Sequence, residues 1–279
     1  MKSIQDCRNF YARFVVGNST QPNERLIAAF AAVEREHYVG AGPWKISTHY
    51  AGYLDTISDD PSQLYQDVLI GLVPDRHINN GQPSLHARCL AACNPKNGES
   101  VLHIGAGTGY YSAILAELVG SDGKVIAYEI ETDLADRARR NLSHLPNVQV
   151  IGASGCAPGL PPADIVYVNA SAPRPMPVWL DALKLGGRLI FPLAPNKGVG
   201  CMLLVTRLAE TKYAAVAVSG AAFIPCVDAG DETMSTVLAA ALKKQSVTSV
   251  KSLRRNNQAD ASAWCAGNGW WLSTSEPTD

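Results

Sequence analysis

The stretch from Val101 to Gly120, VLHIGAGTGYYSAILAELVG, places three glycines between two apolar runs. The run before the glycines predicts a buried strand, and the longer run after them predicts a helix. Glycine allows a sharp turn and a close approach of backbone to a ligand, because no Cβ atom stands in the way. Gly105, Gly107 and Gly109 therefore predict the strand–turn–helix unit that begins many nucleotide-binding folds.

Strand-like and helix-like segments alternate after this turn. We expect strands at 124–130, 148–152, 164–170 and 188–193, with helices at 132–145 and 177–187. This order predicts right-handed crossovers and a parallel sheet covered on both faces. Two further apolar runs, 201–208 and 213–225, are joined by few residues and predict an antiparallel pair. The expected class is α/β, a mostly parallel, doubly wound sheet with an antiparallel edge.

Two other segments flank this core. Residues 1–98 are expected to be mostly helical, with Asn23 capping one helix and another running from Pro83 to before Pro95. Residues 99–227 form the expected core. Residues 228–279 are expected to be an extension with a capped helix at 231–244 and a tryptophan-containing tail. We expect those tryptophans, Trp264, Trp270 and Trp271, to pack on the domain.

The composition excludes several classes of partner. Lys and Arg number 24 against 25 Asp and Glu, so the net charge attracts neither nucleic acid nor an anionic membrane. We find no run of about 18 apolar residues and no signal peptide, which predicts a cytoplasmic protein. The seven cysteines are an odd number and predict reduced thiols. A protein, peptide or small-molecule substrate is the better expectation.

One group of residues could suggest a metal site. Cys89 and Cys93 lie one helical turn apart, with His86 on the same side. No second cluster supplies further ligands, so helix packing is the preferred interpretation and no metal is expected.

Glu129 ends the predicted strand after the glycine turn, 20 residues after Gly109. A carboxylate at this place can accept both hydroxyls of a ribose. A dinucleotide would also fit, but Tyr110 occupies the position of the third glycine in the dinucleotide pattern. A turn without a ligand is the remaining alternative.

As a whole, the pattern resembles the S-adenosylmethionine-dependent methyltransferases, and within them the protein-L-isoaspartate O-methyltransferase family. The similarity runs from Glu24 to Cys226. The successive matches are RLIAAFAAVEREHYV, YQDVLIGL, QPSLHA, VLHIGAGTGYYSAILAELVG, DIVYVNASAPRPMPVWLDALKLGGRLIFPL and AFIP. The resemblance implies a Rossmann-like methyltransferase fold and S-adenosylmethionine as the cofactor.

The resemblance also implies the cofactor-binding residues. The glycine turn would lie against the methionine and ribose parts, Glu129 would bind the ribose hydroxyls, and Asn169 with Ala170 would line the methyl-transfer site. The complete set that it implies is Ile78, Gly105, Ala106, Gly107, Thr108, Gly109, Tyr110, Glu129, Ile130, Ser154, Asn169 and Ala170.

Three parts of the sequence depart from the family. His103 replaces an acidic residue in the first strand, and we expect it to be a satisfied buried histidine. Ser154 stands where the family carries an aspartate near the adenine. In HINNGQPSLHA, Asn79 and Asn80 replace a serine that lies near the acceptor carboxylate, so they are the candidate catalytic residues. An alternative is that Asn-Asn-Gly is only a turn.

The leading hypothesis is a carboxyl O-methyltransferase acting on isoaspartyl groups of proteins or peptides. A carboxylate is already ionised near neutral pH, so this reaction needs positioning rather than a general base. The first alternative is transfer to a small-molecule acid, alcohol or amine, and the second is a non-catalytic nucleotide-binding module. A nicotinamide oxidoreductase is the weakest alternative. The sequence leaves the oligomeric state open.

Overall fold

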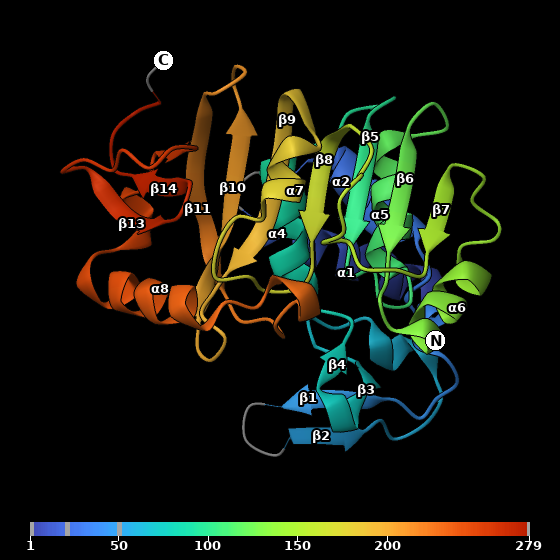
Figure 1. Ribbon diagram of the computed structural model, residues 1–279. Coiled ribbons are helices and arrows are strands. Elements are labelled where there is room, and N and C mark those ends of the chain that lie inside the picture. Colours follow the sequence, from blue (N-terminus) through green and yellow to red (C-terminus); the bar gives the residue numbers. More distant parts are fainter. Residues whose placement is uncertain (1–2, 20–22, 49–51, 278–279) are drawn as a thin grey trace. The chain divides into compact units, whose positions relative to one another are not determined.

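Two compact units make up the chain in the computed structural model, which describes residues 3–19, 23–48 and 52–277 (Figure 1). The first unit contains the described residues of 1–99 and 106–153, and the second contains those of 100–105 and 154–279. The units do not follow the three expected segments, because the strand at 100–104 groups with the later strands. The functional boundaries at residues 98 and 227 stay predictions.

A sheet runs through the second unit (Figure 1). Its strands are, in spatial order, β13 (Ala263–Gly267), β14 (Trp270–Ser273), β12 (Ser252–Arg254), β11 (Tyr213–Ala221), β10 (Gly200–Arg207), β9 (Leu183–Leu193), β8 (Ala163–Val168) and β5 (Ser100–Ile104). Within the order given, β5 pairs parallel with β8, and β8 pairs parallel with β9. Every neighbouring pair from β9–β10 to β14–β13 is antiparallel. The expected α/β class and antiparallel edge are confirmed, and the antiparallel part also includes the tail.

The central strands of this sheet are buried on both faces. Leu102 in β5, Val166 in β8 and Leu189 in β9 are almost completely inaccessible. Strands of this kind appear in sequence as continuous apolar runs rather than alternating ones. This explains why the runs near the glycine turn predict their strands correctly.

The expected helix at 177–187 is shorter than predicted. Helix α7 covers only Pro177–Asp181, and β9 already begins at Leu183. Gly186 has φ +77°, which is incompatible with a continuing α-helix, and Leu183 pairs with Ala163 of β8. The strand pairing and the glycines therefore outweigh the apolar spacing that suggested a helix.

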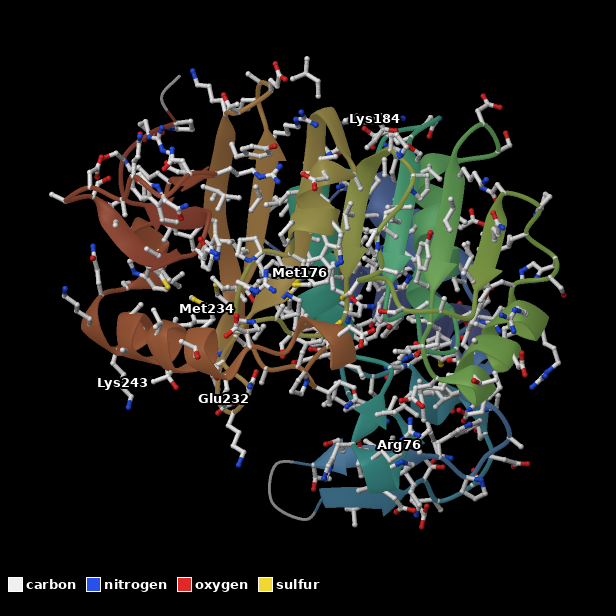
Figure 2. The ribbon with its side chains drawn as sticks, viewed as in Figure 1. Arg76, Met176, Lys184, Glu232, Met234 and Lys243 are labelled. Carbon is white, nitrogen blue, oxygen red and sulfur yellow. The ribbon has the colours of Figure 1, made fainter. Side chains whose placement is uncertain are left out.

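The C-terminal extension forms one helix and three strands of the second unit. Helix α8 (Glu232–Lys244) begins where the Asp231 side chain accepts the Met234 N–H at 2.9 Å. Figure 2 shows Glu232 at the start of α8 and Lys243 near its end, charges that complement the helix dipole. α8 packs against β13. The expected packing of the tryptophans is confirmed, since Trp264, Trp270 and Trp271 are buried.

Helices dominate the first unit. They are α1 (Ile4–Gly17), α2 (Glu24–Ala32), α3 (Arg35–Val39), α4 (Pro83–Cys93), α5 (Tyr110–Val119) and α6 (Thr132–Asn141), with the parallel strands β6 (Lys124–Tyr128) and β7 (Val148–Ile151). The Asn23 cap is confirmed, because its side chain accepts the Leu26 N–H at 2.7 Å. The limits expected for α4 are also confirmed.

No helix among the described residues is both long and apolar enough to cross a membrane. The cytoplasmic location and the lack of a nucleic-acid partner stay predictions.

Residues 45–48 and 52–79 contain no α-helix, which corrects the expectation for this part of the chain. They form two antiparallel pairs, β1 (Lys45–Thr48) with β2 (Gly52–Asp55) and β3 (Gly71–Val73) with β4 (Ile78–Asn79). Short 3-10 turns lie at Pro61–Leu64 and Pro74–Arg76. These strands are too short and too irregular in polarity for their period to be recognised in sequence.

Arg35 organises the connection that leads to these strands. It is fully buried, and its guanidinium group donates to the carbonyl oxygens of Leu64, Gln66 and Val68. A small apolar core of Val39, Trp44, Leu64 and Ile70 lies beside this segment. A buried arginine that satisfies three carbonyls fixes a stretch without regular structure, because each carbonyl would otherwise be costly to bury.

Candidate functional site

The glycine turn between β5 and α5 takes backbone angles that suit glycine. Gly107 has φ +58° and Gly109 has φ +99°. A Cβ atom on Gly109 would lie only 2.7 Å from Leu142 Cδ1, so Gly109 allows the turn to pack against that side chain. At Gly107 the nearest atom to such a Cβ would be Leu72 Cδ1 at 3.5 Å, an ordinary contact. Gly107 is therefore needed for backbone direction rather than for packing.

Glu129 is a buried carboxylate that meets the glycine turn in the first unit. Its side chain follows β6 and is 6% exposed. Oε2 accepts the Gly107 N–H at 2.6 Å, and Oε1 accepts the Glu131 N–H at 3.0 Å. Burial raises the pKa of Glu129, and the two backbone hydrogen bonds oppose that rise. A carboxylate has about four acceptor positions, so this one can still accept two hydroxyl groups.

The backbone around Glu129 ties the turn to the end of β6. The Ala106 N–H donates to the Tyr128 carbonyl at 3.1 Å, and Asn141 Nδ2 donates to the Thr108 carbonyl at 2.9 Å. The structure thus brings Ala106, Gly107, Thr108 and Glu129 together. Their predicted roles with the cofactor stay predictions.

Three other predicted cofactor residues of the first unit have different surroundings. The Tyr110 hydroxyl lies 3.2 Å from the Tyr11 hydroxyl in the core, and burial raises the pKa of Tyr110 well above its usual range. Its side chain therefore has a packing role. Ile78 pairs with Val73 in the short β3–β4 sheet, and Ile130 is exposed directly after Glu129.

His103 and Asn169 form a polar pair in the second unit. Asn169 Nδ2 donates to His103 Nε2 at 2.8 Å, while Asn169 Oδ1 is buried without a hydrogen-bond partner among the described residues. Complete burial lowers the pKa of His103 to about 3, so the ring is neutral. The expectation of a buried, satisfied histidine is confirmed. The unsatisfied Asn169 oxygen follows β8, at the carboxyl end of a parallel strand, where such sheets bind ligands.

The remaining predicted residues of the second unit lie on loops near the strand ends. A Cβ atom on Gly105 would meet the Asn169 backbone carbon at 3.5 Å, so the two strand ends are close. Ser154 Oγ accepts the Cys156 N–H at 3.2 Å, and Ala170 is partly buried. Their contacts with a cofactor stay predictions.

The two asparagines of the HINNGQP loop differ in how completely their side chains are hydrogen-bonded. Asn79 Oδ1 accepts the Gly81 N–H at 2.9 Å, and Asn79 Nδ2 donates to the His77 carbonyl at 3.2 Å. Asn80 Oδ1 accepts the Ile70 N–H at 2.9 Å, but Asn80 Nδ2 is buried without a partner among the described residues. Asn79 therefore fits a turn-forming role. Asn80 keeps a free donor, as recognition of a carboxylate requires.

Gly81 and His86 fix the end of this loop. Gly81 has φ +75°, and a Cβ atom there would lie 2.2 Å from His86 Nε2. His86 stacks on Tyr111 with ring centroids 3.6 Å apart, and Cys89 and Cys93 are buried on the same helix. These contacts fit the helix-packing interpretation of the three residues, and the expectation that no metal binds here stays a prediction. Within the described residues, no group of three His, Cys, Asp or Glu side chains could hold a metal ion.

Sequence reasoning missed Asp67, which holds the start of α4 beside the loop. Its carboxylate accepts the Ser84 N–H at 2.8 Å, the Ser84 hydroxyl at 2.6 Å and Gln82 Nε2 at 3.2 Å. Asp67 acts as a helix cap from a distance of 17 residues. A search for capping residues directly before a helix cannot find such a partner.

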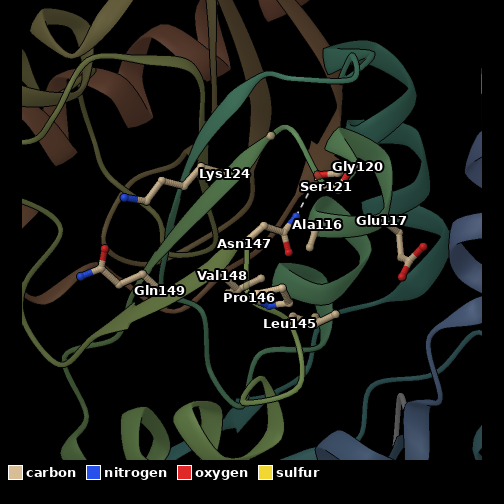
Figure 3. A pocket seen from close by; sticks show the side chains of 11 residues that line it. Ala116, Glu117, Gly120, Ser121, Lys124, Leu145, Pro146, Asn147, Val148 and Gln149 are labelled. Carbon is tan, nitrogen blue, oxygen red and sulfur yellow. Dashed lines mark hydrogen bonds between the residues drawn. The ribbon is translucent and has the colours of Figure 1, made fainter.

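A cavity of about 580 Å³ lies beside the starts of β6 and β7 (Figure 3). Glu129 directly follows the other end of β6. Lys124, at the start of β6, and Gln149, near the start of β7, contribute to its wall together with Asn147. Parallel sheets bind their ligands beyond the carboxyl ends of the strands. This cavity lies at the amino ends and is therefore not the predicted cofactor site.

Comparison with known proteins decides the family. Residues 17–231 match the family described as protein-L-isoaspartate(D-aspartate) O-methyltransferase (PCMT). The chain belongs to this family. A protein-L-isoaspartate O-methyltransferase of Ignicoccus hospitalis is 34% identical over 151 residues, covering 52% of this chain and 71% of that protein. Protein-L-isoaspartate O-methyltransferase 1 of Archaeoglobus fulgidus is 46% identical over 103 residues, covering 35% of this chain and 47% of that protein. The chain thus spans about half the length of the Archaeoglobus relative.

Solved structures agree with this family in fold. A protein-L-isoaspartate O-methyltransferase superimposes with a TM-score of 0.64 at 22% identity, covering 86% of this chain and 70% of that one. A PCMT from Plasmodium falciparum in complex with S-adenosyl-L-homocysteine has a TM-score of 0.62 at 16% identity, with coverages of 81% and 99%. At these identities the structures show the methyltransferase fold.

Proposed function

We propose that this chain is an S-adenosylmethionine-dependent carboxyl O-methyltransferase acting on isoaspartyl groups of proteins or peptides. The observation that carries the proposal is the buried Glu129 carboxylate, which accepts N–H groups from the glycine turn and from Glu131. Membership of the PCMT family supplies the expected substrate class.

The residues of the first unit would bind the ribose of the cofactor. The hydrogen bond from Gly107 fixes the orientation of the Glu129 carboxylate before any ligand arrives. Its remaining acceptor positions fit the two hydroxyls of a ribose. When bound, S-adenosylmethionine supplies a methyl group on a positively charged sulfur.

Residues on the loops would orient the acceptor. A carboxylate is ionised near neutral pH and needs no general base, so the protein has to place its oxygen in line with the methyl group. Asn80 Nδ2 is a buried donor without a partner among the described residues, and it fits one oxygen of such a carboxylate. In the second unit, Asn169 Oδ1 is a buried acceptor without a partner among the described residues.

A small-molecule acid is the second candidate acceptor. The observation that favours it is the Asn79 turn, in which the Asn79 side chain bonds to His77 and Gly81 of its own loop. This loop departs from the family's usual sequence. A loop held this way could present a different entrance to the acceptor site.

A transfer assay with methyl-labelled S-adenosylmethionine tests both candidates. The matched substrates are two peptides of one sequence, one with an isoaspartyl and one with an ordinary aspartyl linkage, together with a panel of small acids. We expect label on the isoaspartyl peptide only, released as methanol by mild base because the product is an ester. Label that resists base, or label on a small acid alone, would contradict the isoaspartyl assignment.

A further inference from the structure

Cys156 and Cys226 bring two thiols together within the second unit. Their Sγ atoms are 3.4 Å apart, although 70 positions separate the residues in the chain. Both side chains are partly exposed, whereas Cys201 and Cys265 of the same unit are buried. Burial raises the pKa of Cys201 to about 12 and that of Cys265 to about 11, which makes them poor nucleophiles. The close pair is thus also the accessible pair.

Backbone contacts hold both members of the pair. The Ser171 N–H donates to the Ile224 carbonyl and the Cys226 N–H donates to the Ser171 carbonyl, each at 2.8 Å. On the other segment, the Cys156 N–H donates to Ser154 Oγ at 3.2 Å. The short sulfur separation therefore follows from the local backbone on both sides.

Cys226 is the more acidic thiol of the two. The hydrogen bond between the two thiols lowers the pKa of Cys226, burial and the negative charge of Asp228 oppose that change, and the backbone N–H groups of Asp228 and Ala229 lower the pKa further. The same hydrogen bond raises the pKa of Cys156, and burial adds to that rise. Because the thiolate is the reactive form of cysteine, Cys226 reacts first and Cys156 second.

We propose that Cys156 and Cys226 are an oxidant-sensitive dithiol, which a peroxide converts into an intramolecular disulfide. The Cys226 thiolate attacks a peroxide oxygen, so that an S–O bond forms and the O–O bond breaks. The hydroxide that leaves takes up the proton that Cys226 has lost and becomes water. The Cys156 sulfur then attacks the Cys226 sulfur, forming the S–S bond and breaking the S–O bond, and hydroxide leaves with the Cys156 proton. Two thiols and one peroxide give one disulfide and two waters.

The disulfide has a consequence for the predicted cofactor residues, which rests on the proposed function. A disulfide brings the sulfurs from 3.4 Å to about 2.05 Å, so it draws together the two side chains and ties the segments that carry them. One segment carries Ser154, and the other is bonded to Ser171, two residues after Asn169. We expect the oxidised protein to bind S-adenosylmethionine roughly tenfold more weakly, and dithiothreitol to restore the affinity.

The test oxidises the full chain with hydrogen peroxide and maps its peptides without reduction. The variants are Cys156→Ser and Cys226→Ser, and the matched control is Cys7→Ser, another partly exposed cysteine. The unaltered protein and the Cys7→Ser control should show a peptide linked through residues 156 and 226. Cys156→Ser should stop at a sulfenic acid on Cys226 that dimedone captures. Cys226→Ser should consume peroxide more slowly.

Each readout separates one part of the proposal. An oxidised protein without the 156–226 link would overturn the dithiol. Cys226→Ser reacting at the unaltered rate would overturn the order in which the two thiols react. A link that forms without any change in cofactor affinity would overturn the regulatory consequence alone. If the reduced protein does not bind S-adenosylmethionine, the proposed function fails, while the peptide map still decides the dithiol.

Discussion

Glu129 and Asn80 are both buried polar side chains of the first unit, but the protein satisfies them to different extents. Both oxygens of Glu129 accept backbone N–H groups, so its carboxylate is held in one orientation. The Asn80 side-chain oxygen accepts the Ile70 N–H, and its side-chain nitrogen has no partner among the described residues. The comparison separates a side chain whose position the backbone fixes from one that keeps an amide donor available. In the proposed function the first binds the cofactor and the second meets the substrate.

The largest expected effect comes from removing the fixed carboxylate. Glu129→Ala removes charge-assisted hydrogen bonds of roughly 1.5 to 3 kcal/mol, so affinity for S-adenosylmethionine should fall about tenfold to hundredfold. Titration calorimetry measures this directly. Glu129→Gln keeps the shape and one acceptor oxygen, and it should lose less.

Glu131→Gln is the matched control for this measurement. Its side chain pairs with Arg76 at 2.7 Å on the surface, while its backbone N–H still reaches Glu129. Exposed ion pairs contribute little, so cofactor affinity should stay unchanged. If Glu129→Ala binds the cofactor as tightly as this control, the assignment of the ribose carboxylate is wrong.

His103 extends the comparison to the second unit, where Asn169 satisfies a buried ring. Its pKa of about 3 in the folded state lies below the value of about 6.5 expected when unfolded. The unfolded chain therefore takes up a proton first as the pH falls, and stability decreases between about pH 6.5 and pH 3. At pH 5 the cost from this residue is about 2 kcal/mol.

Urea unfolding of the unaltered protein and of His103→Gln at pH 7 and pH 5 measures this cost. Other titrating groups contribute equally to both proteins, so the drop in unfolding free energy from pH 7 to pH 5 should be about 2 kcal/mol smaller in the variant. Equal drops would mean that His103 is not held neutral by burial.

The comparison also explains what the sequence could reveal. The position of Glu129 was predictable because it lies at the end of the strand after the glycine turn, 20 residues after Gly109. The strand β5 and helix α5 were predictable because their apolar runs are long. The free donor of Asn80 was not predictable. It depends on Ile70, ten residues away, whose N–H bonds to the side-chain oxygen and leaves the side-chain nitrogen without a partner among the described residues.

Long-range partners were beyond sequence reasoning for the same reason. Arg35 satisfies three carbonyls about 30 residues away, and Asp67 caps a helix that begins 16 residues later. The strands at 45–79 depend on this support rather than on their own short apolar pattern. Asp67 is one such long-range partner, and it bonds to Gln82 and Ser84 beside the loop that is proposed to hold the acceptor.

The smallest of the three expected effects distinguishes the two asparagines of that loop. Asn80→Asp keeps an oxygen that accepts the Ile70 N–H, but it replaces the free amide donor by an oxygen that repels a carboxylate. We expect kcat/KM for an isoaspartyl peptide to fall about tenfold, which corresponds to about 1.4 kcal/mol, with cofactor affinity unchanged. Asn79→Asp adds the same charge and keeps the oxygen that accepts the Gly81 N–H, so it is the matched control and should change transfer little.

Equal losses in both variants would mean that added charge, rather than the Asn80 donor, causes the effect. A parallel loss of cofactor affinity would remove the distinction between the Glu129 and Asn80 regions, because both would then act on the same ligand.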